Sequence, residues 1–538
     1  MPRRIVRTVR LPELFPRHAR ALTLLCAAAA LTFQLSGCAV GPNYQRPSAA
    51  VPASFKEAPE GWKVAHPADQ TDRGPWWTIY NDAQLNALED QLNAQNQTVA
   101  QYAAAYRQAR ALVGEARAAY FPVIGASASA TRSRTPTHVS NASGSFPNGT
   151  ITNNFNLGLD ATWEPDLWGK VSRTVGAQEA GQQGAAADLA NARLSAQATL
   201  AQTYFTLRSL DAQQRLLDDT VAAYQKSLQL TQNQYAQGVA GRADVILAQT
   251  QLQSAQAAAI DNGIARAEDE HAIAVLIGQP ASTFSLPPSP LAATPPVVPL
   301  SMPSALLERR PDIASAERKA ASANEQIGVA MSAFFPSLTI SASGGFESSV
   351  FSNLLSMPSR FWTLGPSLAG TLFDAGLRSA QTEAARAAYD QQVATYRQTV
   401  LSAFQDVEDN LASQRILAQE VVIQQQAVES ARHALQIVTN EYKAGTTDFQ
   451  NVLSAQTTAF IAQQKLASIG GQRMVSSVGL VKALGGGWDV TQMDRETGDI
   501  AAPKRVNASG AQTGQSGARD AATASASASA STQATASQ

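Results

Sequence analysis

The 538-residue sequence has little charge and very few cysteines and histidines. Asp, Glu, Lys and Arg make up 15% of the chain, whereas about 25% is usual in soluble proteins. A net charge of −1 gives no electrostatic reason to bind nucleic acid. Five scattered histidines and two cysteines do not suit a metal cage or a disulfide framework. Because no Ser/His/Asp grouping, phosphate loop or paired acidic site is recognisable either, we expect no catalytic residues, no metal and no cofactor.

The amino terminus has the pattern of a secretory signal. Six arginines and one glutamate precede an apolar, alanine-rich run over 21–35, which is short for a transmembrane helix. The run ends in Leu-Ser-Gly-Cys at 35–38, which resembles a bacterial lipobox; the alternative is an ordinary signal with a stray cysteine. The resemblance implies removal of 1–37 and a covalent lipid on Cys38, with Ala39 favouring the outer membrane. Several acyl chains on one residue suffice for anchoring, at about 0.8 kcal/mol per buried methylene.

The chain contains an internal repeat. Tyr-Ala-Gln-Gly at 235–238 returns as Tyr-Lys-Ala-Gly at 442–445, and Ala-Gln-Thr at 248–250 returns at 455–457, in both cases 207 residues later. Phe-Pro at 121–122 has an echo at 335–336, and the order of the motifs is the same in both halves. We interpret this pattern as a duplication.

The repeats, a proline-rich stretch and two irregular ends predict the domain organisation. The predicted parts are a lipoprotein signal over 1–37, an anchor and extended segment over 38–80, a first repeat over 81–279, a connector over 280–303, a second repeat over 304–487 and a C-terminal segment over 488–538. The connector has eight prolines in 24 residues, so no helix can run through it. The Ala/Ser/Thr/Gln-rich end is expected to be largely disordered after 500.

Long helices are predicted in both repeats. Residues 377–444 include neither glycine nor proline, and a continuous helix of that length would reach roughly 100 Å. Apolar residues recur there in steps of seven, a spacing typical of coiled-coil packing. These residues are Val393, Val400 and Val407, then Val421, Val428, Leu435 and Tyr442, with Val221, Leu228 and Tyr235 at the equivalent places of the first repeat. The other faces carry Gln, Ala, Ser and Thr rather than the Glu and Lys of an isolated coiled coil, so we expect several helices side by side in a wall.

Four strands are predicted, as hairpins over about 121–163 and 335–373. Apolar and polar residues alternate over 155–163 and 338–346, and the lengths suit outer-membrane strands, although soluble strands alternate in the same way. An open sheet in lipid would leave backbone groups unpaired at two edges, so other copies must supply strands. Two copies would give eight strands and a nearly filled interior. Three copies would give twelve strands and a passable lumen, which favours a trimer.

Several motifs together resemble one known family. The sequence is similar to outer-membrane efflux lipoproteins of the NodT/OprM type, relatives of TolC, in Cys-Ala-Val-Gly-Pro-Asn-Tyr at 38–44, Trp-Trp at 76–77, Glu-Pro-Asp-Leu-Trp-Gly-Lys at 164–170, Arg-Arg-Pro-Asp-Ile at 309–313 and Phe-Pro at 335–336. The resemblance covers about 40–490. It implies a mainly α fold with membrane β structure, in which four strands per chain contribute to a homotrimeric twelve-stranded barrel above a periplasmic α-barrel.

The same resemblance implies a function and partners. The chain would be the passive outer-membrane exit duct of a tripartite efflux system for drugs or other small molecules. Its partners would be a periplasmic adaptor, an inner-membrane RND transporter and outer-membrane lipid. A duct for type I protein secretion remains an alternative. A lipid-anchored adaptor or structural coiled coil is a further alternative, although such proteins lack four membrane strands.

By this resemblance, the turns within 235–249 and 442–456 are the periplasmic tips. The predicted docking residues are Tyr235, Gly238, Arg242, Asp244, Tyr442, Lys443, Gly445 and Asp448, and the candidate gate residues are Asp244, Gln450, Asn451, Leu453 and Ser454. The two glycines should end the long helices in a left-handed conformation, and 446–448 should cap the next helix. Two positions that are aspartates in TolC fall on Asn451 and Ser454, so Asp244, the duplicate of Asn451, is our candidate for the gate charge.

Overall fold

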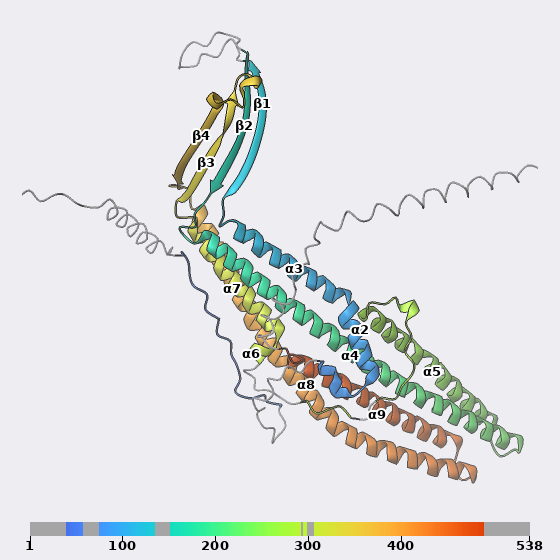
Figure 1. Ribbon diagram of the computed structural model, residues 1–538. Coiled ribbons are helices and arrows are strands. Elements are labelled where there is room, and N and C mark those ends of the chain that lie inside the picture. Colours follow the sequence, from blue (N-terminus) through green and yellow to red (C-terminus); the bar gives the residue numbers. More distant parts are fainter. Residues whose placement is uncertain (1–38, 58–74, 135–150, 292–293, 299–305, 489–538) are drawn as a thin grey trace, which may run out of the picture. The chain divides into compact units, whose positions relative to one another are not determined.

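The computed structural model describes residues 39–57, 75–134, 151–291, 294–298 and 306–488, all within the unit that ends at Met493. Two series of elements follow one another with the same order (Figure 1). The first consists of α3 (Gln97–Ala118), β1 (Val123–Arg134), β2 (Ile151–Trp163), α4 (Lys170–Ala236) and α5 (Arg242–Leu276). The second consists of α7 (Pro311–Ser332), β3 (Ser337–Ser348), β4 (Arg360–Ala369), α8 (Leu377–Lys443) and α9 (Phe449–Ala483). Shorter helices are η2 (Trp76–Tyr80), α2 (Ala83–Gln95), η3 (Ala281–Thr283), α6 (Leu306–Arg309), η5 (Phe351–Asn353) and η6 (Met357–Ser359).

The helices of the two repeats correspond residue for residue. Both α4 and α8 have 67 residues, and both α5 and α9 have 35. Each boundary of α8 and α9 lies 207 residues after its counterpart. Upstream of the hairpins, α3 and α7 both have 22 residues and are 214 apart. The duplication predicted from short motifs is therefore confirmed, and the change of offset falls in the hairpin regions.

The four predicted strands are present and form one antiparallel sheet in the order β1-β2-β3-β4. Val123 pairs with Thr162 in the first hairpin, and Leu338 pairs with Leu368 in the second. The pairing of β2 with β3, which includes Trp163 opposite Ile340, joins the two repeats. Among the described residues, the outer strands β1 and β4 each have one neighbour, so each leaves one edge open.

The helices form a layer in which α4 contacts α3, α5, α7 and α9, while α8 contacts α7 and α9. The predicted steps of seven are confirmed in α8, where Val400, Val407, Val428 and Tyr442 are buried. In α4 the period is confirmed, but the prediction is wrong for Tyr235, and the most buried set is another one. The buried set is Leu217, Tyr224 and Thr231, whereas Val221 and Leu228 are half-buried and Tyr235 is exposed. Both sets recur every seven residues, and sequence periodicity does not tell which of them faces the partner helix.

A buried charge cluster fastens the connector to the first repeat. Asp211 accepts hydrogen bonds from Arg208 at 2.7 Å and from Arg266 at 2.9 Å. The same arginines donate to the backbone oxygens of Pro287 at 2.9 Å and Leu286 at 2.6 Å. Removing one partner of such a buried pair usually costs about 3–5 kcal/mol, because the other charge stays buried. The part of the connector at Leu286 and Pro287 is thus held by polar contacts with arginine side chains of the first repeat.

Glu89 in α2 should make the stability of the protein depend on pH. Its side chain is fully buried, and neither carboxylate oxygen has a partner among the described residues. Burial, with a smaller contribution from Asp90, raises the pKa of Glu89 to about 9 from an ordinary value of 4.5. Between these two values the folded protein keeps a proton that the unfolded chain releases. The free energy of unfolding should therefore fall as pH rises from 5 to 9, by at most about 1.4 kcal/mol per pH unit.

The measurement is denaturant-induced unfolding of the detergent-solubilised protein at several pH values. In Glu89→Gln, the decrease with pH should be smaller than in the unmodified protein. The control is Glu115→Gln, which changes an exposed carboxylate on the adjacent α3 and should leave the decrease unchanged. An identical pH dependence of all three proteins would contradict the prediction.

Candidate functional site

The turns at the ends of the long helices carry the predicted docking and gate residues. The first turn lies between α4 and α5, and the second lies between α8 and α9. Gly238 and Gly445 have φ of 74° and 76°, a left-handed conformation that costs glycine little because it has no Cβ. The predicted glycine caps are therefore confirmed.

The structure brings the two turns together. Ala248 of α5 packs in one apolar cluster with Tyr442, Phe449 and Val452 of the second repeat. Most of the predicted residues lie on the surface near this cluster. The exposed ones are Tyr235, Gly238, Arg242, Lys443, Gly445, Asp448, Gln450, Asn451 and Ser454, while Asp244 and Leu453 are half-buried. The four charged residues of the predicted docking set therefore belong to one end of the helical layer.

Tyr442 differs from the other members of the docking set because it is buried. Its side chain is 6% exposed, whereas that of its duplicate Tyr235 is 49% exposed. The ring of Tyr442 lies 5.4 Å from that of Phe449. The duplicate of Phe449 is Arg242, so the first turn has no equivalent aromatic contact. Within one chain, Tyr442 stabilises the second turn from inside.

The two aspartates near the turns have different local contacts. Asp244 accepts a hydrogen bond from the backbone N–H of Gly241 at 3.1 Å and so caps the start of α5. Asp448 is the N-cap residue of α9, but its side chain makes no capping hydrogen bond with the described residues. The prediction that 446–448 cap this helix is thus wrong for Asp448, and the hydroxyl of Thr447 instead accepts from Asn451 at 2.8 Å.

Residues 39–57, here called the N-terminal strap, contact both repeats. Near its start, the N–H of Val40 donates to the oxygen of Trp168 at 3.1 Å. Further along, the hydroxyl of Tyr44 donates to Glu317 at 2.6 Å. At its far end Glu57 forms a 2.5 Å ion pair with Arg415 in α8. The strap therefore connects the region next to the sheet with the middle of the helical layer.

Arg173 in α4 holds the first residues of the strap. Its guanidinium donates to the backbone oxygens of Val40 and Gly41, both at 3.2 Å, and to Asn43 at 3.1 Å. An ion pair with Glu325 at 2.9 Å fixes the guanidinium, which is 8% exposed. Sequence reasoning missed Arg173, since it lies outside every recognised motif. The nearby motifs at 38–44 and 164–170 were the available signal, because the structure brings them into contact.

Cys38, the predicted lipid attachment site, lies outside the described residues. Its neighbour Ala39 packs closely on Gly169, so that a Cβ added to Gly169 would lie 2.8 Å from the Cα of Ala39.

Gly169 ends the passage from β2 to α4, and several aromatic side chains lie close to this passage. Trp168 stacks on Phe335 with 4.8 Å between ring centroids, and its indole N–H donates to the oxygen of Pro336 at 2.7 Å.

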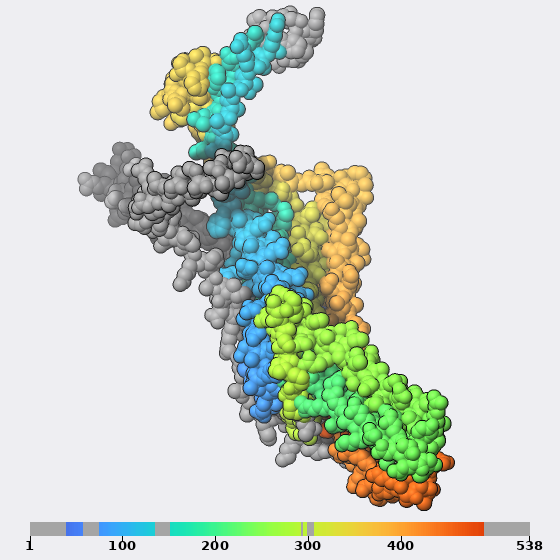
Figure 2. All heavy atoms as spheres, turned by 90° about the vertical axis from the view of Figure 1, so that its right-hand side faces the viewer, coloured from blue at the N-terminus to red at the C-terminus, as the bar shows by residue number. Residues whose placement is uncertain are grey.

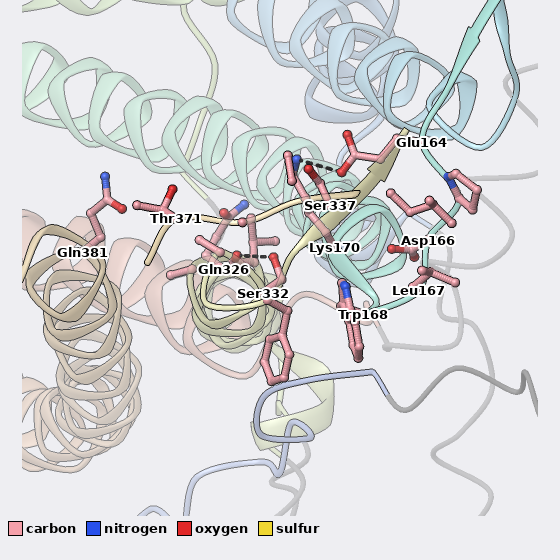
Figure 3. Close-up of a pocket in the computed structure, with 18 of the residues that line it drawn as sticks. Glu164, Asp166, Leu167, Trp168, Lys170, Gln326, Ser332, Ser337, Thr371 and Gln381 are labelled. Atoms are coloured by element: carbon pink, nitrogen blue, oxygen red, sulfur yellow. Dashed lines mark hydrogen bonds and ion pairs between the residues drawn. The ribbon is translucent and has the colours of Figure 1, made fainter. Parts of the chain in front are cut away.

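A cavity of about 730 Å³ opens at this junction of strands and helices (Figure 3). Glu164, Trp168 and Lys170 line it from the first repeat, and Gln326 and Thr371 line it from the second. Lys170 and Glu164 face each other at 3.5 Å. The lining is thus mixed, and its charged groups are the carboxylates of Glu164 and Asp166 and the ammonium of Lys170.

Asp166 and Asp374 hold the strand-to-helix passages of the two repeats. Asp166 accepts hydrogen bonds from the N–H groups of Val171 at 3.0 Å and Ser172 at 2.7 Å. Asp374 accepts from the N–H of Gly376 at 3.0 Å. Both aspartates therefore act as turn and capping residues at the start of the long helices.

No helix in the described ranges combines the length and the apolar character that a membrane span needs. In the same part of the chain, no three His, Cys, Asp or Glu side chains gather in a group that could hold a metal ion.

Comparisons with known proteins find relatives over most of the chain. The model of the family described as outer membrane efflux protein matches residues 84–279 and 302–486. The solvent efflux pump outer membrane protein SrpC of Pseudomonas putida is 32% identical over 467 residues, which are 85% of this chain and 97% of SrpC. The antibiotic efflux pump outer membrane protein ArpC of Pseudomonas putida is 30% identical over 491 residues, or 89% and 99% of the two chains. The solved outer-membrane channel OprN is similar with a TM-score of 0.78 and 30% identity, covering 84% of this chain and all of OprN.

The different burial of the duplicated tyrosines leads to a prediction for the turns. Tyr442→Ala should destabilise the second turn by about 3 kcal/mol, since it removes a buried aromatic ring. Tyr235→Ala should change stability by less than about 1 kcal/mol, since that ring is largely exposed. Hydrogen exchange of the backbone amides in 438–455 and 231–248 measures both effects. Equal acceleration of exchange in the two variants would contradict the prediction.

Proposed function

The chain belongs to the outer membrane efflux protein family and is an outer-membrane efflux channel, and on this premise we propose that three copies form its duct. The observation that carries the proposal is the four-stranded sheet with two open edges. Its strands have 10–13 residues, enough to cross a bilayer at a tilt. Lipid does not tolerate unpaired strand edges, so neighbouring copies supply the missing strands. Three copies give twelve strands and an open lumen.

We further propose that this duct is passive and catalyses no reaction. A passive duct needs a partner that supplies energy. This need supports the proposal that an inner-membrane RND transporter drives export and that a periplasmic adaptor joins the transporter to the duct. Relatives named for solvent and antibiotic pumps support small molecules as cargo rather than the proteins of type I secretion. The four-stranded sheet argues against a periplasmic adaptor or a purely structural coiled coil.

The proposed docking site for the adaptor is the pair of turns at the end of the helical layer. Their exposed charges Arg242, Lys443 and Asp448 lie in a chain that has little charge elsewhere. Charges at an interface set its register and its sensitivity to salt. The proposed gate consists of Asp244, Gln450, Asn451, Leu453 and Ser454, which follow the same two turns at the start of α5 and α9.

Conductance in planar bilayers tests the proposed duct. The purified protein should form trimers that conduct ions, and the absence of conductance under every opening condition would contradict the proposal. Asp244→Ala should raise the conductance and the leak of a normally excluded antibiotic, because it removes both the charge and the cap of α5.

Two further variants separate these causes. Asp244→Asn keeps an oxygen that can accept the hydrogen bond of Gly241 but removes the charge, so a leak in this variant assigns the gate to the charge. Asp448→Ala removes an exposed aspartate without a capping bond and serves as the control. If Asp244→Ala leaks no more than the unmodified protein, Asp244 has no part in the gate.

We also propose that Cys38 carries a lipid and that Arg173 holds the start of the strap that follows it. Cys38→Ser should abolish acyl labelling. Arg173→Ala should leave the labelling intact but release the start of the strap, so that the backbone amide of Val40 exchanges with deuterium at least about tenfold faster, because each hydrogen bond to a charged group contributes about 1.5–3 kcal/mol. Arg386→Ala removes an exposed arginine of α8 and should leave this exchange unchanged. Unaltered exchange in Arg173→Ala would show that other contacts hold the strap.

A further inference from the structure

Three arginines lie at the distal end of the sheet, which is the end away from the helices. Each hairpin leaves the helices with one strand and returns with the next, and Figure 2 shows the strands, in cyan and yellow, extending beyond the helices. Arg132 and Arg134 are among the last residues of β1, and Arg360 is the first residue of β4. All three side chains are exposed. Among the described residues, none of the three has an ion-pair partner.

The three arginines project from the apolar face of the sheet. Arg134 is paired with Ile151 and Arg360 with Phe346, and paired residues of neighbouring strands point to the same side. Because side chains alternate between the two faces, the register assigns a large apolar set to the same face: Ile124, Phe155, Leu157, Leu159, Trp163, Leu338, Ile340, Trp362, Leu364 and Leu368. The other face carries mainly Ser, Thr, Asn and Gly. In a membrane barrel the apolar face is turned to lipid.

No carboxylate on this face balances the arginines. The sequence has no Asp or Glu over 121–159 or over 348–373, the two stretches that hold the three arginines. The acidic residues of the described strands are Asp160 and Glu347, and the register places both on the polar face. The distal end of the apolar face therefore has an excess of positive charge.

The two ends of the sheet differ in charge. At the end next to the helices, charges of both signs are paired, as in Glu164 with Lys170 and Asp374 with Arg378. The helical tunnel of the channel lies in the periplasm, so the distal end of the sheet lies at the outer leaflet of the membrane. The unbalanced positive charge is thus confined to the outer leaflet.

We infer that Arg132, Arg134 and Arg360 bind the phosphate groups of a lipid in the outer leaflet. The inference rests on the proposed barrel, which places the apolar face of the sheet in lipid. An arginine at the edge of an apolar band keeps its stem in the hydrocarbon and extends its guanidinium to the headgroups. The planar guanidinium has paired donors that match the oxygens of a phosphate. The lipid's acyl chains would then lie on the apolar face of the same strands.

The duplication predicts how the open edges of two copies pair. The numbers of paired residues sum to 285 in the first hairpin and to 706 in the second, a difference of 421 that equals 214 from β1 to β3 plus 207 from β2 to β4. Between β2 and β3 the sum is 503. Exchanging β2 for β4 adds 207, and exchanging β3 for β1 subtracts 214. The sum between β4 and the neighbouring copy's β1 is therefore 496.

This register brings the arginines of two copies together. Trp362 of one copy lies opposite Arg134 of the next, and Arg360 is two residues away from Trp362 on the same face. Arg360 and Arg134 are thus diagonal neighbours, about 7–8 Å apart, and Arg132 follows two residues further along β1. Like charges at such positions repel each other, and a phosphate between them would relieve the repulsion. A barrel of three copies has one such site at each contact between copies.

Native mass spectrometry of the full-length protein in an uncharged detergent tests the site. The probe is lipid A, a glycolipid with two phosphate groups, and up to three molecules should stay bound to each trimer. The charge-removed variant carries Arg132→Gln, Arg134→Gln and Arg360→Gln. Its apparent Kd for lipid A should be at least about tenfold higher, because each lost hydrogen bond to a charged group weakens binding by roughly that factor.

A matched control removes the same charge elsewhere. It carries Arg107→Gln, Arg386→Gln and Arg432→Gln, at exposed positions of α3 and α8, and should bind lipid A as the unmodified protein does. Arg360→Gln alone should also raise the Kd, and it covers the case in which the charge-removed variant does not fold. Lipid A without its phosphates should bind the unmodified protein at least about tenfold more weakly. Inorganic phosphate at the concentration of lipid A should not displace it, since phosphate has no acyl chains.

Light scattering and bilayer conductance of the same samples separate this site from the proposed duct. Weaker binding by the charge-removed variant but not by the control, with both still conducting trimers, supports the inference. Conducting trimers that bind lipid A equally well without the three arginines, or that bind the lipid equally well without its phosphates, would overturn the site and leave the duct intact. Displacement by inorganic phosphate would likewise overturn a lipid site. An unmodified protein that is monomeric and does not conduct would contradict the duct and the site between its copies.

Discussion

The rest of the structure depends on one interaction, the lateral contact between α4 of the first repeat and α9 of the second. In a layer one helix thick, each helix can bury its surface only against its two neighbours in the layer. Small, uncharged side chains such as Ser209 and Gly471 allow the helices to approach closely at that contact. The low charge of the sequence follows from this arrangement, because a charged side chain on a lateral face would need a partner in the next helix.

Local chemistry made much of this fold predictable. A segment without glycine or proline over 377–444 allows one helix, and α8 covers nearly all of it. Gly238 and Gly445 end their helices because they can adopt positive φ without strain. Asp166 and Asp374 cap the passages into α4 and α8 because a carboxylate can accept from free N–H groups at a helix start. In each case the deciding contact lies within a few residues of the signal.

Other features were hidden because they depend on contacts between distant segments. The motifs around Tyr235 and Tyr442 match, yet only Tyr442 is buried, since its neighbours come from α9 and α5. Arg173 carries no motif of its own, and its role becomes visible only when residues 40–43 lie across α4. The steps of seven in α4 gave the correct period but did not identify Leu217, Tyr224 and Thr231 as the most buried set, for the same reason. Periodicity in the sequence indicates that a helix packs against another helix. The side on which that helix lies depends on how the helices are arranged in the layer.

The positions at which the duplicates differ have a consequence for the partners of the duct. The long helices correspond residue for residue, but Arg242 corresponds to Phe449, and Asp244 corresponds to Asn451. The first turn therefore presents charged groups where the second has a buried ring and a neutral amide. If three copies form the duct, its helical layer approaches six-fold symmetry, while these charges recur only three times around it. A partner that recognises the charges reads a three-fold pattern, whereas one that recognises only the shape of the turns meets six nearly equivalent sites. The duplication thus makes the helical layer regular. The residues that differ between the two repeats determine which of the six turns a charged partner can distinguish.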